Sequence, residues 1–392
     1  SRDMSERKSE IEKILSGLSD HVSSIKEVML ANAVMIGEIP APTFKEERRI
    51  AFLRDRFTEA GLEKISIDEM ENAVAVIPGK TGKKKILVSA NADSYISEKV
   101  DHAMTVTSDE ITGPGICDNT LGLAAIATLP VLLDKLDIQF NDDLILMAET
   151  RSLGKGNLDG LKFFLDNSPL PVRTGVVVRG VHLGRLSYSS LGMFRGEITV
   201  TSPERKDWKN YSTGGAIAIL NRIISRIGEI PLPSQPKTTV ILGSIHGGNA
   251  FNTEATRATL GFEVRSEETG RITWITQVIQ DIVDEIDFET DSTIELKMVA
   301  RRKMGGIPYS HALVKTVKEI VEQLGVKPKI APSTGQLSAF VDKGIPALTI
   351  GLTNGFNVHE DAESAAIDPM FQGLTQLVAL LIAIDKGICD ED

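Results

Sequence analysis

The stretch KKKILVSANADSY, residues 83–95, contains an apolar run that ends in polar residues. A lysine-flanked run of Ile, Leu and Val is typical of a buried strand, and Asn91 and Asp93 stand where that strand would pass into a loop. A strand that ends in His-x-Asp would indicate a metal site, because histidine is a common zinc ligand. Asparagine takes the histidine position here, so this strand end raises the question of which chemistry the fold still supports.

Three further apolar runs share this pattern: DDLILMA (142–148), TGVVVRG (174–180) and PALTIGL (346–352). Segments with helical periodicity separate them, such as LGLAAIATLPVLLDKL (121–136). Strands that alternate with helices predict an α/β fold, with a mostly parallel mixed sheet covered by helices. Ligands of such sheets bind beside the carboxyl ends of the strands, so we expect the residues after these runs to form the functional site.

Between residues 190 and 303 the pattern changes. Segments typical of strands and helices follow the order β-α-β-β-α-β, which is that of a ferredoxin-like unit. After residue 303 the first pattern returns. The sequence therefore predicts an α/β domain of residues 1–189 and 304–392, interrupted by an inserted α+β domain of residues 190–303. A chain of 392 residues exceeds the size of most single cores, which agrees with two domains.

The composition argues against several classes of partner. The chain has 43 basic and 54 acidic residues and a formal net charge of −11, which disfavours nucleic acid and anionic membranes. The sequence has no apolar run of membrane-spanning length, and its N-terminal residues form no signal-peptide core. Cys117 and Cys389 are too few and too far apart for a disulfide framework or a zinc knuckle. We therefore expect a cytoplasmic protein with no nucleic acid and no membrane partner.

Four segments, in order along the chain, resemble motifs of a known family. They are IPAPTFKEE (39–47), GICDNTLGLAAI (115–126), GSIHGGNAFNTEATRATLGFEVRS (243–266) and NVHEDAESAAI (357–367). At these segments the chain resembles the co-catalytic zinc peptidases typified by peptidase T, carboxypeptidase G, aminoacylase and acetylornithine deacetylase. The third segment lies in the inserted domain, where this family carries its lid, so the resemblance covers nearly the whole chain.

The resemblance implies a site for two divalent metal ions, but several ligand positions are altered. The family holds its first metal with a histidine, a bridging aspartate and a later aspartate, and these positions are Asn91, Asp118 and Arg179. The second metal uses the same bridging aspartate and a terminal histidine, which His359 matches. Asp93 matches an aspartate that orients the missing histidine. An amide is a poor zinc ligand and a guanidinium is none, so we expect Arg179 to act as a built-in cation paired with Asp118.

The Glu-Glu pair of the family supplies a general base and a ligand of the second metal. AETRSLGKG (148–156) matches it in three registers. In the first register the pair is Ala148-Glu149, which keeps the metal ligand. In the second it is Glu149-Thr150, which keeps the general base. In the third it is Thr150-Arg151, which keeps neither. No register retains both carboxylates.

The resemblance also extends to the inserted domain. Gly247, Gly248 and Asn252 match positions that line the substrate cleft of the family. The family places a histidine after the first strand of this domain, but residues 199–215 contain none, and Arg205 is the nearest positive charge that could take its electrostatic role. A homodimer formed through the inserted domain is a further implication of the resemblance.

Some of these residues also have a purely structural interpretation. Asp118 precedes a predicted helix, where aspartate is a favoured N-cap. Glu149 could be an exposed residue at a strand end. Thr43 and Glu46 have the spacing of a capping box for the helix that follows them.

The sequence leaves two hypotheses open. In the first, the di-metal site is degenerate, hydrolysis is absent or weak, and the cleft binds a short peptide or amino-acid derivative. In the second, the chain is an active aminopeptidase, tripeptidase or N-acyl amino acid amidohydrolase that uses one metal or altered ligands. The donor set is compatible with zinc or another divalent ion at one site and argues against two. The candidate catalytic residues are Asp93 and Glu149, and the candidate metal ligands are Asp118, His359 and Glu149.

Overall fold

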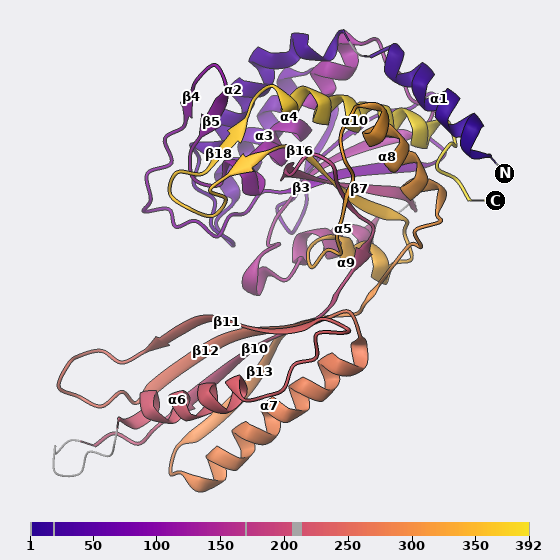
Figure 1. Cartoon of the computed structure of the whole chain (residues 1–392). Helices are drawn as coiled ribbons and strands as arrows, with labels where there is room; N and C mark the ends of the chain where they lie inside the picture. The colour runs from indigo at the N-terminus through magenta and orange to yellow at the C-terminus, as the bar shows by residue number, and fades with distance from the viewer. Residues whose placement is uncertain (1, 19, 169–170, 206–213, 392) are drawn as a thin grey trace. The chain divides into compact units, whose positions relative to one another are not determined.

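The computed structural model describes residues 2–18, 20–168, 171–205 and 214–391. The chain divides into two compact units (Figure 1). The first unit comprises Ser1–Ser190 and Gly306–Asp392, and the second unit, the inserted domain, comprises Leu191–Gly305. Each unit has a hydrophobic core of its own.

The first unit is built on an eight-stranded sheet with the order β1-β2-β6-β3-β7-β16-β8-β15. The pairs β3–β6, β3–β7, β7–β16 and β8–β15 are parallel, and the pairs β1–β2, β2–β6 and β8–β16 are antiparallel. This arrangement confirms the predicted mostly parallel mixed sheet. The strands are β1 (Lys64–Ile67), β2 (Ala73–Ile77), β3 (Lys85–Asn91), β6 (Asp143–Glu149), β7 (Val172–Val181), β8 (Arg185–Ser187), β15 (Lys329–Ile330) and β16 (Ala347–Thr353).

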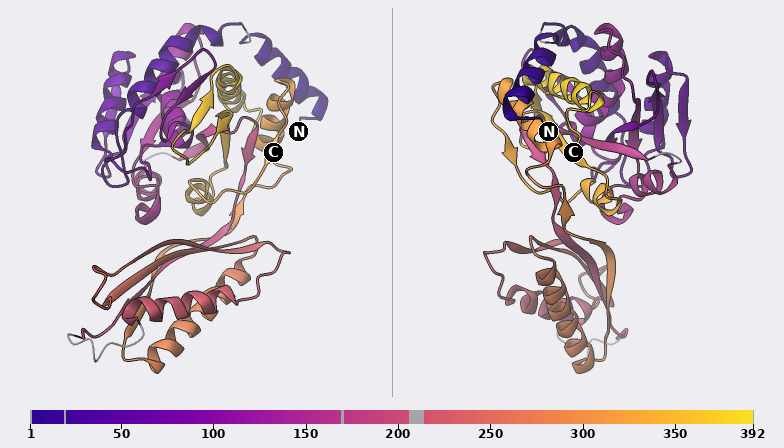
Figure 2. Two further views of the ribbon diagram at one scale, coloured as in Figure 1. Left: turned by 60° about the vertical axis from the view of Figure 1, so that its left-hand side comes forward. Right: turned by 90° about the vertical axis from the view of Figure 1, so that its right-hand side faces the viewer.

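Helices cover both faces of this sheet (Figure 2). In β3, Ile86 and Val88 belong to the core that includes residues of α2, α4 and α10, whereas Leu87 belongs to the core formed with α5 and α9. Successive side chains of a strand point to opposite faces, so this alternation fits a sheet buried on both sides. The helices are α1 (Met4–Ser16), α2 (Lys26–Gly37), α3 (Glu47–Glu59), α4 (Leu121–Lys135), α5 (Asp159–Asn167), α8 (Ala312–Gln323), α9 (Leu337–Asp342) and α10 (Pro369–Asp385), with short turns η1 (Val22–Ile25), η2 (Ile116–Thr120) and η3 (Gly154–Gly156).

One helix of the described residues has the length and apolar composition of a membrane span. It is the segment Ile116–Lys135, which contains α4. In the fold 89% of its most apolar window is buried. The central helix of a soluble core has the same composition, and α4 packs in this way against α2, β3 and β7.

A smaller sheet with the order β17-β18-β5-β4 brings two distant loops together. β18 (Ser364–Ala366) pairs antiparallel with β5 (Glu110–Thr112), and β17 (Gly355–Phe356) and β4 (Thr105–Val106) flank them. Glu363 strengthens the junction because its carboxylate accepts hydrogen bonds from the backbone N–H groups of Gly115 (2.9 Å) and Cys117 (3.1 Å). The loop that carries Asp118 therefore lies against the loop that carries His359. Two short strands, β9 (Ser189–Ser190) and β14 (Gly305–Gly306), form a separate ribbon.

The inserted domain has the predicted β-α-β-β-α-β order and an antiparallel sheet with the order β11-β12-β10-β13. Alternate residues of the strands, such as Leu260, Phe262 and Val264 of β12, pack with α6 and α7 in a single core. The helices lie on one face of this sheet (Figure 1), as in an α+β domain. The elements are β10 (Gly192–Thr201), α6 (Gly215–Gly228), β11 (Thr238–Gly247), β12 (Arg257–Ser266), α7 (Thr269–Glu289) and β13 (Thr293–Arg302).

Candidate functional site

The candidate site begins as a row of side chains across the central strands of the first unit. The registers pair Glu149 of β6 with Asn91 of β3, and Arg179 of β7 with Gly351 of β16. Directly opposite residues of neighbouring strands project to the same face of a sheet. A hydrogen bond between the Arg179 and Asn91 side chains joins the two halves of the row. The carboxyl-end residues expected from the sequence are thus side by side.

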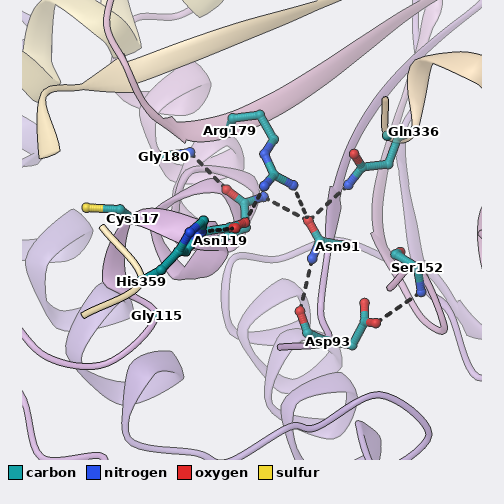
Figure 3. Close-up of polar contacts among 12 residues, drawn as sticks. Asn91, Asp93, Gly115, Cys117, Asn119, Ser152, Arg179, Gly180, Gln336 and His359 are labelled. Carbon is teal, nitrogen blue, oxygen red and sulfur yellow. Dashed lines mark hydrogen bonds and ion pairs between the residues drawn. The ribbon is translucent and has the colours of Figure 1, made fainter. Parts of the chain in front are cut away.

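Arg179 is the centre of this row (Figure 3). Its Nη1 donates to Asn91 Oδ1 at 2.9 Å, and its Nη2 forms an ion pair with Asp118 Oδ1. The predicted pairing of Arg179 with Asp118 is therefore present, and the two side chains are only 16% and 17% exposed. Burial alone would raise the pKa of Asp118, but the charges of Arg179 and His359 outweigh it, and the pKa is lowered. Asp118 is consequently a stable carboxylate.

Asp118 is not the N-cap of α4, so the structural alternative for this residue is wrong. α4 begins at Leu121, and Thr120 is its N-cap residue. Asp118 instead directs its second oxygen to His359 Nε2 at 2.9 Å. His359 is 57% exposed and has a φ of 72°, and its ring meets Tyr95 edge-on with centroids 5.0 Å apart. Both residues matched to the second metal position are therefore in contact with each other.

Asn91 acts as a hydrogen-bond hub and is only 1% exposed. Its Oδ1 accepts from Arg179, from Asn119 Nδ2 at 3.2 Å and from Gln336 Nε2 at 3.0 Å, and its Nδ2 donates to the Asp93 carbonyl at 2.9 Å (Figure 3). An imidazole has no carbonyl oxygen, so a histidine could not replace these three accepted bonds. Sequence reasoning missed Gln336 and Asn119, because neither carries a charge or a ligand spacing.

Asp93 holds the loop that follows β6. Its Oδ2 accepts from the backbone N–H groups of Ser152 (3.1 Å) and Leu153 (2.9 Å) and from the Thr43 hydroxyl (2.8 Å), while its Oδ1 is buried without a hydrogen-bond partner. Burial raises the pKa of Asp93 in spite of these donors. The described contacts of this side chain are to that loop and to Thr43, and not to the residue 91 side chain that the resemblance would have it orient.

The capping box expected from Thr43 and Glu46 is wrong. α3 begins at Glu47 with no side-chain cap, and Thr43 donates to Asp93 instead. Glu46 Oε2 accepts the backbone N–H of Arg151 at 2.6 Å, so it fastens the same loop as Asp93. Burial raises the pKa of Glu46 to about 7.

Glu149 is completely buried, so its interpretation as an exposed strand end is also wrong. Its carboxylate accepts from the hydroxyls of Ser89 and Ser152 at 3.4 Å each. Burial, and less strongly the charge of Asp93, raise the pKa of Glu149 to about 7. Its described hydrogen-bond partners do not include Asp118 or His359, the two other candidate ligands.

This donor set differs from the ligand pattern that the resemblance implies. The first metal position faces a guanidinium and an amide, and a cation adjacent to Asp118 opposes the binding of a second cation there. The second position has Asp118 and His359 in contact. Among residues 2–18, 20–168, 171–205 and 214–391, no group of three or more His, Cys, Asp or Glu side chains could hold a metal ion. A two-metal centre does not fit these residues as they stand.

The four substrate-binding candidates all lie in the inserted domain. Arg205 forms ion pairs with Asp291 (2.7 Å) and Glu254 (3.6 Å), so acidic neighbours already balance its charge. Gly247 ends β11, and Gly248 follows with a φ of 78°, a conformation that favours glycine. Asn252 lies in the loop between β11 and β12. Their role in binding stays a prediction.

Comparisons with known proteins agree with this fold and with the inserted domain. The profile of the peptidase dimerisation domain family matches residues 209–291, within the inserted domain. The chain as a whole has the fold of the M20 peptidases, which confirms the resemblance to peptidase T-like proteins and the predicted α/β fold with an inserted domain.

Three solved structures illustrate this likeness. A tripeptidase from Staphylococcus aureus subsp. aureus Mu50 has 19% identity and a TM-score of 0.73, over 92% of this chain and 99% of that chain. The dipeptidase Dug1p from Saccharomyces cerevisiae has 13% identity and a TM-score of 0.79, over 95% and 98%. A dinuclear metal-binding peptidase of the M20 family from Bacillus subtilis has 14% identity and a TM-score of 0.61, over 93% and 99%. No curated protein sequence matches the chain. At these identities the likeness establishes the fold alone.

Proposed function

We propose that this protein is a peptidase-fold relative with a degenerate di-metal site, which binds a short peptide or an amino-acid derivative and hydrolyses it weakly or not at all. The observation that supports this most directly is the Arg179 guanidinium, which bonds Asp118 and Asn91 at once. A cation built into the protein takes the electrostatic place of a metal ion.

The size of the effect supports the same proposal. At about 4 Å and an effective dielectric near 20, a unit charge opposes a divalent ion by roughly 8 kcal/mol. A good structural zinc site contributes roughly 10–16 kcal/mol in total. A metal at Asp118 would therefore lose a large part of its binding free energy to Arg179, although the carboxylate between the two cations reduces this cost.

The alternative function is a metal-dependent hydrolase of short peptides or N-acyl amino acids that uses one metal or altered ligands. The contact between Asp118 and His359 favours it, since both side chains match ligands of the second position. The raised pKa of the buried Glu149, about 7, also suits a general base. The likeness to peptidases of known structure is equally compatible with this alternative.

Metal analysis and a substrate panel distinguish the two functions. The protein is purified without chelator, its metal content is measured by mass spectrometry, and hydrolysis of a dipeptide, a tripeptide and an N-acetyl amino acid is followed with added zinc, cobalt or manganese. We expect substoichiometric metal and little turnover. Stoichiometric metal with turnover would refute the degenerate site.

A double variant provides the matched control. Asn91→His together with Arg179→Asp restores the ligand types that the resemblance implies for the first metal position. We expect this variant to bind more metal than the wild-type protein under identical conditions. The single variant Asn91→His keeps the Arg179 charge and should bind no more metal than the wild type.

We also propose that the protein forms a homodimer through the inserted domain and acts in the cytoplasm. The sheet of the inserted domain ends in β11, whose residues Ile241, Leu242 and Ile245 are 38%, 44% and 58% exposed. An edge strand with exposed apolar side chains is a ready surface for pairing with another chain. Two buried, unpaired cysteines, Cys117 and Cys389, suit a reducing compartment.

A further inference from the structure

A row of positive side chains continues from the candidate site toward the edge of the sheet. Arg179 of β7 lies opposite Gly351 of β16. The antiparallel register of β16 with β8, which pairs Ile350 with Leu186, brings Arg185 to the level of Gly351. Arg185 in turn lies opposite Lys329 of β15, the edge strand. Opposite residues project to one face, so Arg179, Arg185 and Lys329 share a face of the sheet.

The chain approaches itself closely at Gly351, the position in the row that lacks a side chain. A Cβ atom there would lie 2.1 Å from the carbonyl oxygen of His182, which crosses the sheet between β7 and β8. The same carbonyl accepts the backbone N–H of Arg185 at 3.0 Å. Glycine at position 351 thus permits the crossing that sets the position of Arg185.

Arg179 and Arg185 differ in how their charges are balanced. Arg179 has Asp118 and Asn91 as partners, whereas the described hydrogen bond of the Arg185 side chain is from Nε to Ser187 Oγ at 3.3 Å. In the part of the chain that the structure describes, no carboxylate forms an ion pair with Arg185 or with Lys329. The charges of Arg179 and Arg185 both act on Asp118 and lower its pKa, and Lys329 lies opposite Arg185 on the same face.

The pKa values of two groups in this row are lowered by burial and by the neighbouring positive charges. Burial lowers the pKa of Arg185 to about 10, and the neighbouring Arg179 acts in the same direction, while Asp118 acts less strongly in the opposite direction. Burial also lowers the pKa of His182, and Lys329 and Arg185 lower it further. A partly desolvated guanidinium beside other cations is costly unless an anion accompanies it, and Arg185 remains accessible enough to meet one from solution.

We propose that Arg185, with Lys329 beside it, is the anchor for a carboxylate group of the ligand. The proposal rests on the proposed function, because it names the part of the peptide or amino-acid derivative that the site holds. The planar fork of a guanidinium donates two parallel hydrogen bonds to the two oxygens of a carboxylate, a geometry that an ammonium group lacks. The two cations thus have different roles: Arg179 neutralises Asp118, and Arg185 binds the ligand.

The test compares two probes that differ in one group. N-acetylglycine carries a carboxylate, and N-acetylglycinamide carries a neutral amide of similar shape. Their affinities are measured by calorimetry for the wild-type protein and for Arg185→Gln, Arg185→Lys and a surface control, Arg54→Gln. We expect the wild type and the control to prefer the acid about ten- to hundredfold, as a charge-assisted hydrogen bond implies. Arg185→Gln should lose that preference and Arg185→Lys should keep a part of it.

Three results would overturn the proposal. Equal affinity of the wild type for both probes would show that no cation anchors a carboxylate. An undiminished preference in Arg185→Gln would assign the carboxylate to another residue and leave the proposed function intact. Binding of inorganic phosphate, lost in Arg185→Gln, with no binding of N-acetylglycine or glycylglycine, would refute the carboxylate assignment and the proposed ligand class together. Thermal melts of each variant report folding, and Arg185→Lys retains the charge if Arg185→Gln does not fold.

Discussion

The side chains of Arg179 and Asp118 should stabilise the fold through a measurable coupling energy in the absence of any metal. The perturbation is a double-mutant cycle made of Arg179→Met, Asp118→Asn and the double variant. Removal of one partner of a fully buried ion pair costs about 3–5 kcal/mol of unfolding free energy. The two side chains are 16% and 17% exposed, and His359 remains beside Asp118, so we expect about 2–3 kcal/mol for each single variant. The double variant leaves no unpaired charge, which gives a coupling energy of about 2 kcal/mol.

The positions of the two tryptophans in the chain allow unfolding of the two units to be followed separately. Trp208 and Trp274 both fall within Leu191–Gly305, so tryptophan fluorescence follows the inserted domain. Urea unfolding is recorded by far-UV circular dichroism for the whole chain and by fluorescence for the inserted domain. The cycle should shift the transition seen by circular dichroism and leave that seen by fluorescence unchanged.

A surface pair supplies the control for this cycle. Arg54 and Asp55 lie 3.2 Å apart with side chains 48% and 61% exposed, and their coupling should be below about 0.5 kcal/mol. A coupling energy as small as this between Arg179 and Asp118 would refute the proposal that Arg179 acts as a built-in cation for Asp118. So would a loss of stability in EDTA that equals the effect of Asp118→Asn, since Asp118 would then hold a metal in the native protein.

Three further outcomes follow from the structure. Burial raises the pKa of Glu46 from 4.5 to about 7, so its proton stabilises the fold. Glu46 should therefore contribute a fall of up to about 3 kcal/mol in the unfolding free energy as pH rises from 4.5 to 7, and Glu46→Gln should remove this share of the slope in urea titrations, while the share of Glu149 remains. Gly351→Ala should cost about 1–3 kcal/mol of unfolding free energy because its Cβ would meet the His182 carbonyl, whereas Gly228→Ala, with no atom within 4 Å of the new Cβ, should be nearly neutral. Ile245→Asp on the exposed edge strand should convert a dimer to a monomer in light scattering, and a monomeric wild type would contradict the proposed interface.

The sequence predicted the sheet and the residues at its carboxyl edge because both depend on local patterns. Apolar runs followed by polar residues mark parallel strands whose ends meet, so Asn91, Arg179 and Glu149 could be expected side by side. The pairing of Arg179 with Asp118 could be expected as well, since a charge at the end of a buried strand needs a partner.

The features that sequence did not predict depend on long-range register and on loop packing. Gln336 reaches Asn91 only because α9 begins beside β3, and Arg185 enters the row only because β8 returns antiparallel to β16. Thr43 has the spacing of a capping residue, but Asp93 offers its hydroxyl a buried acceptor. A buried carboxylate without its hydrogen-bond donor would cost more free energy than an uncapped helix end, which water can satisfy. The Thr43 hydroxyl therefore bonds Asp93, and the capping box does not form.

The arrangement of charges suggests how one substitution reverses the preference of such a site. A sheet edge that presents aspartates concentrates negative charge and attracts divalent cations. The resemblance implies an aspartate at position 179, and an arginine there changes the local charge by two units. Asp118 balances that arginine in an ion pair. Arg185 and Lys329, on the neighbouring strands β8 and β15, form no ion pair among the described residues. The same edge that would recruit a metal ion in a carboxylate-rich relative is therefore expected to recruit an anion here, and the group that a peptide or N-acyl amino acid offers for this purpose is its carboxylate.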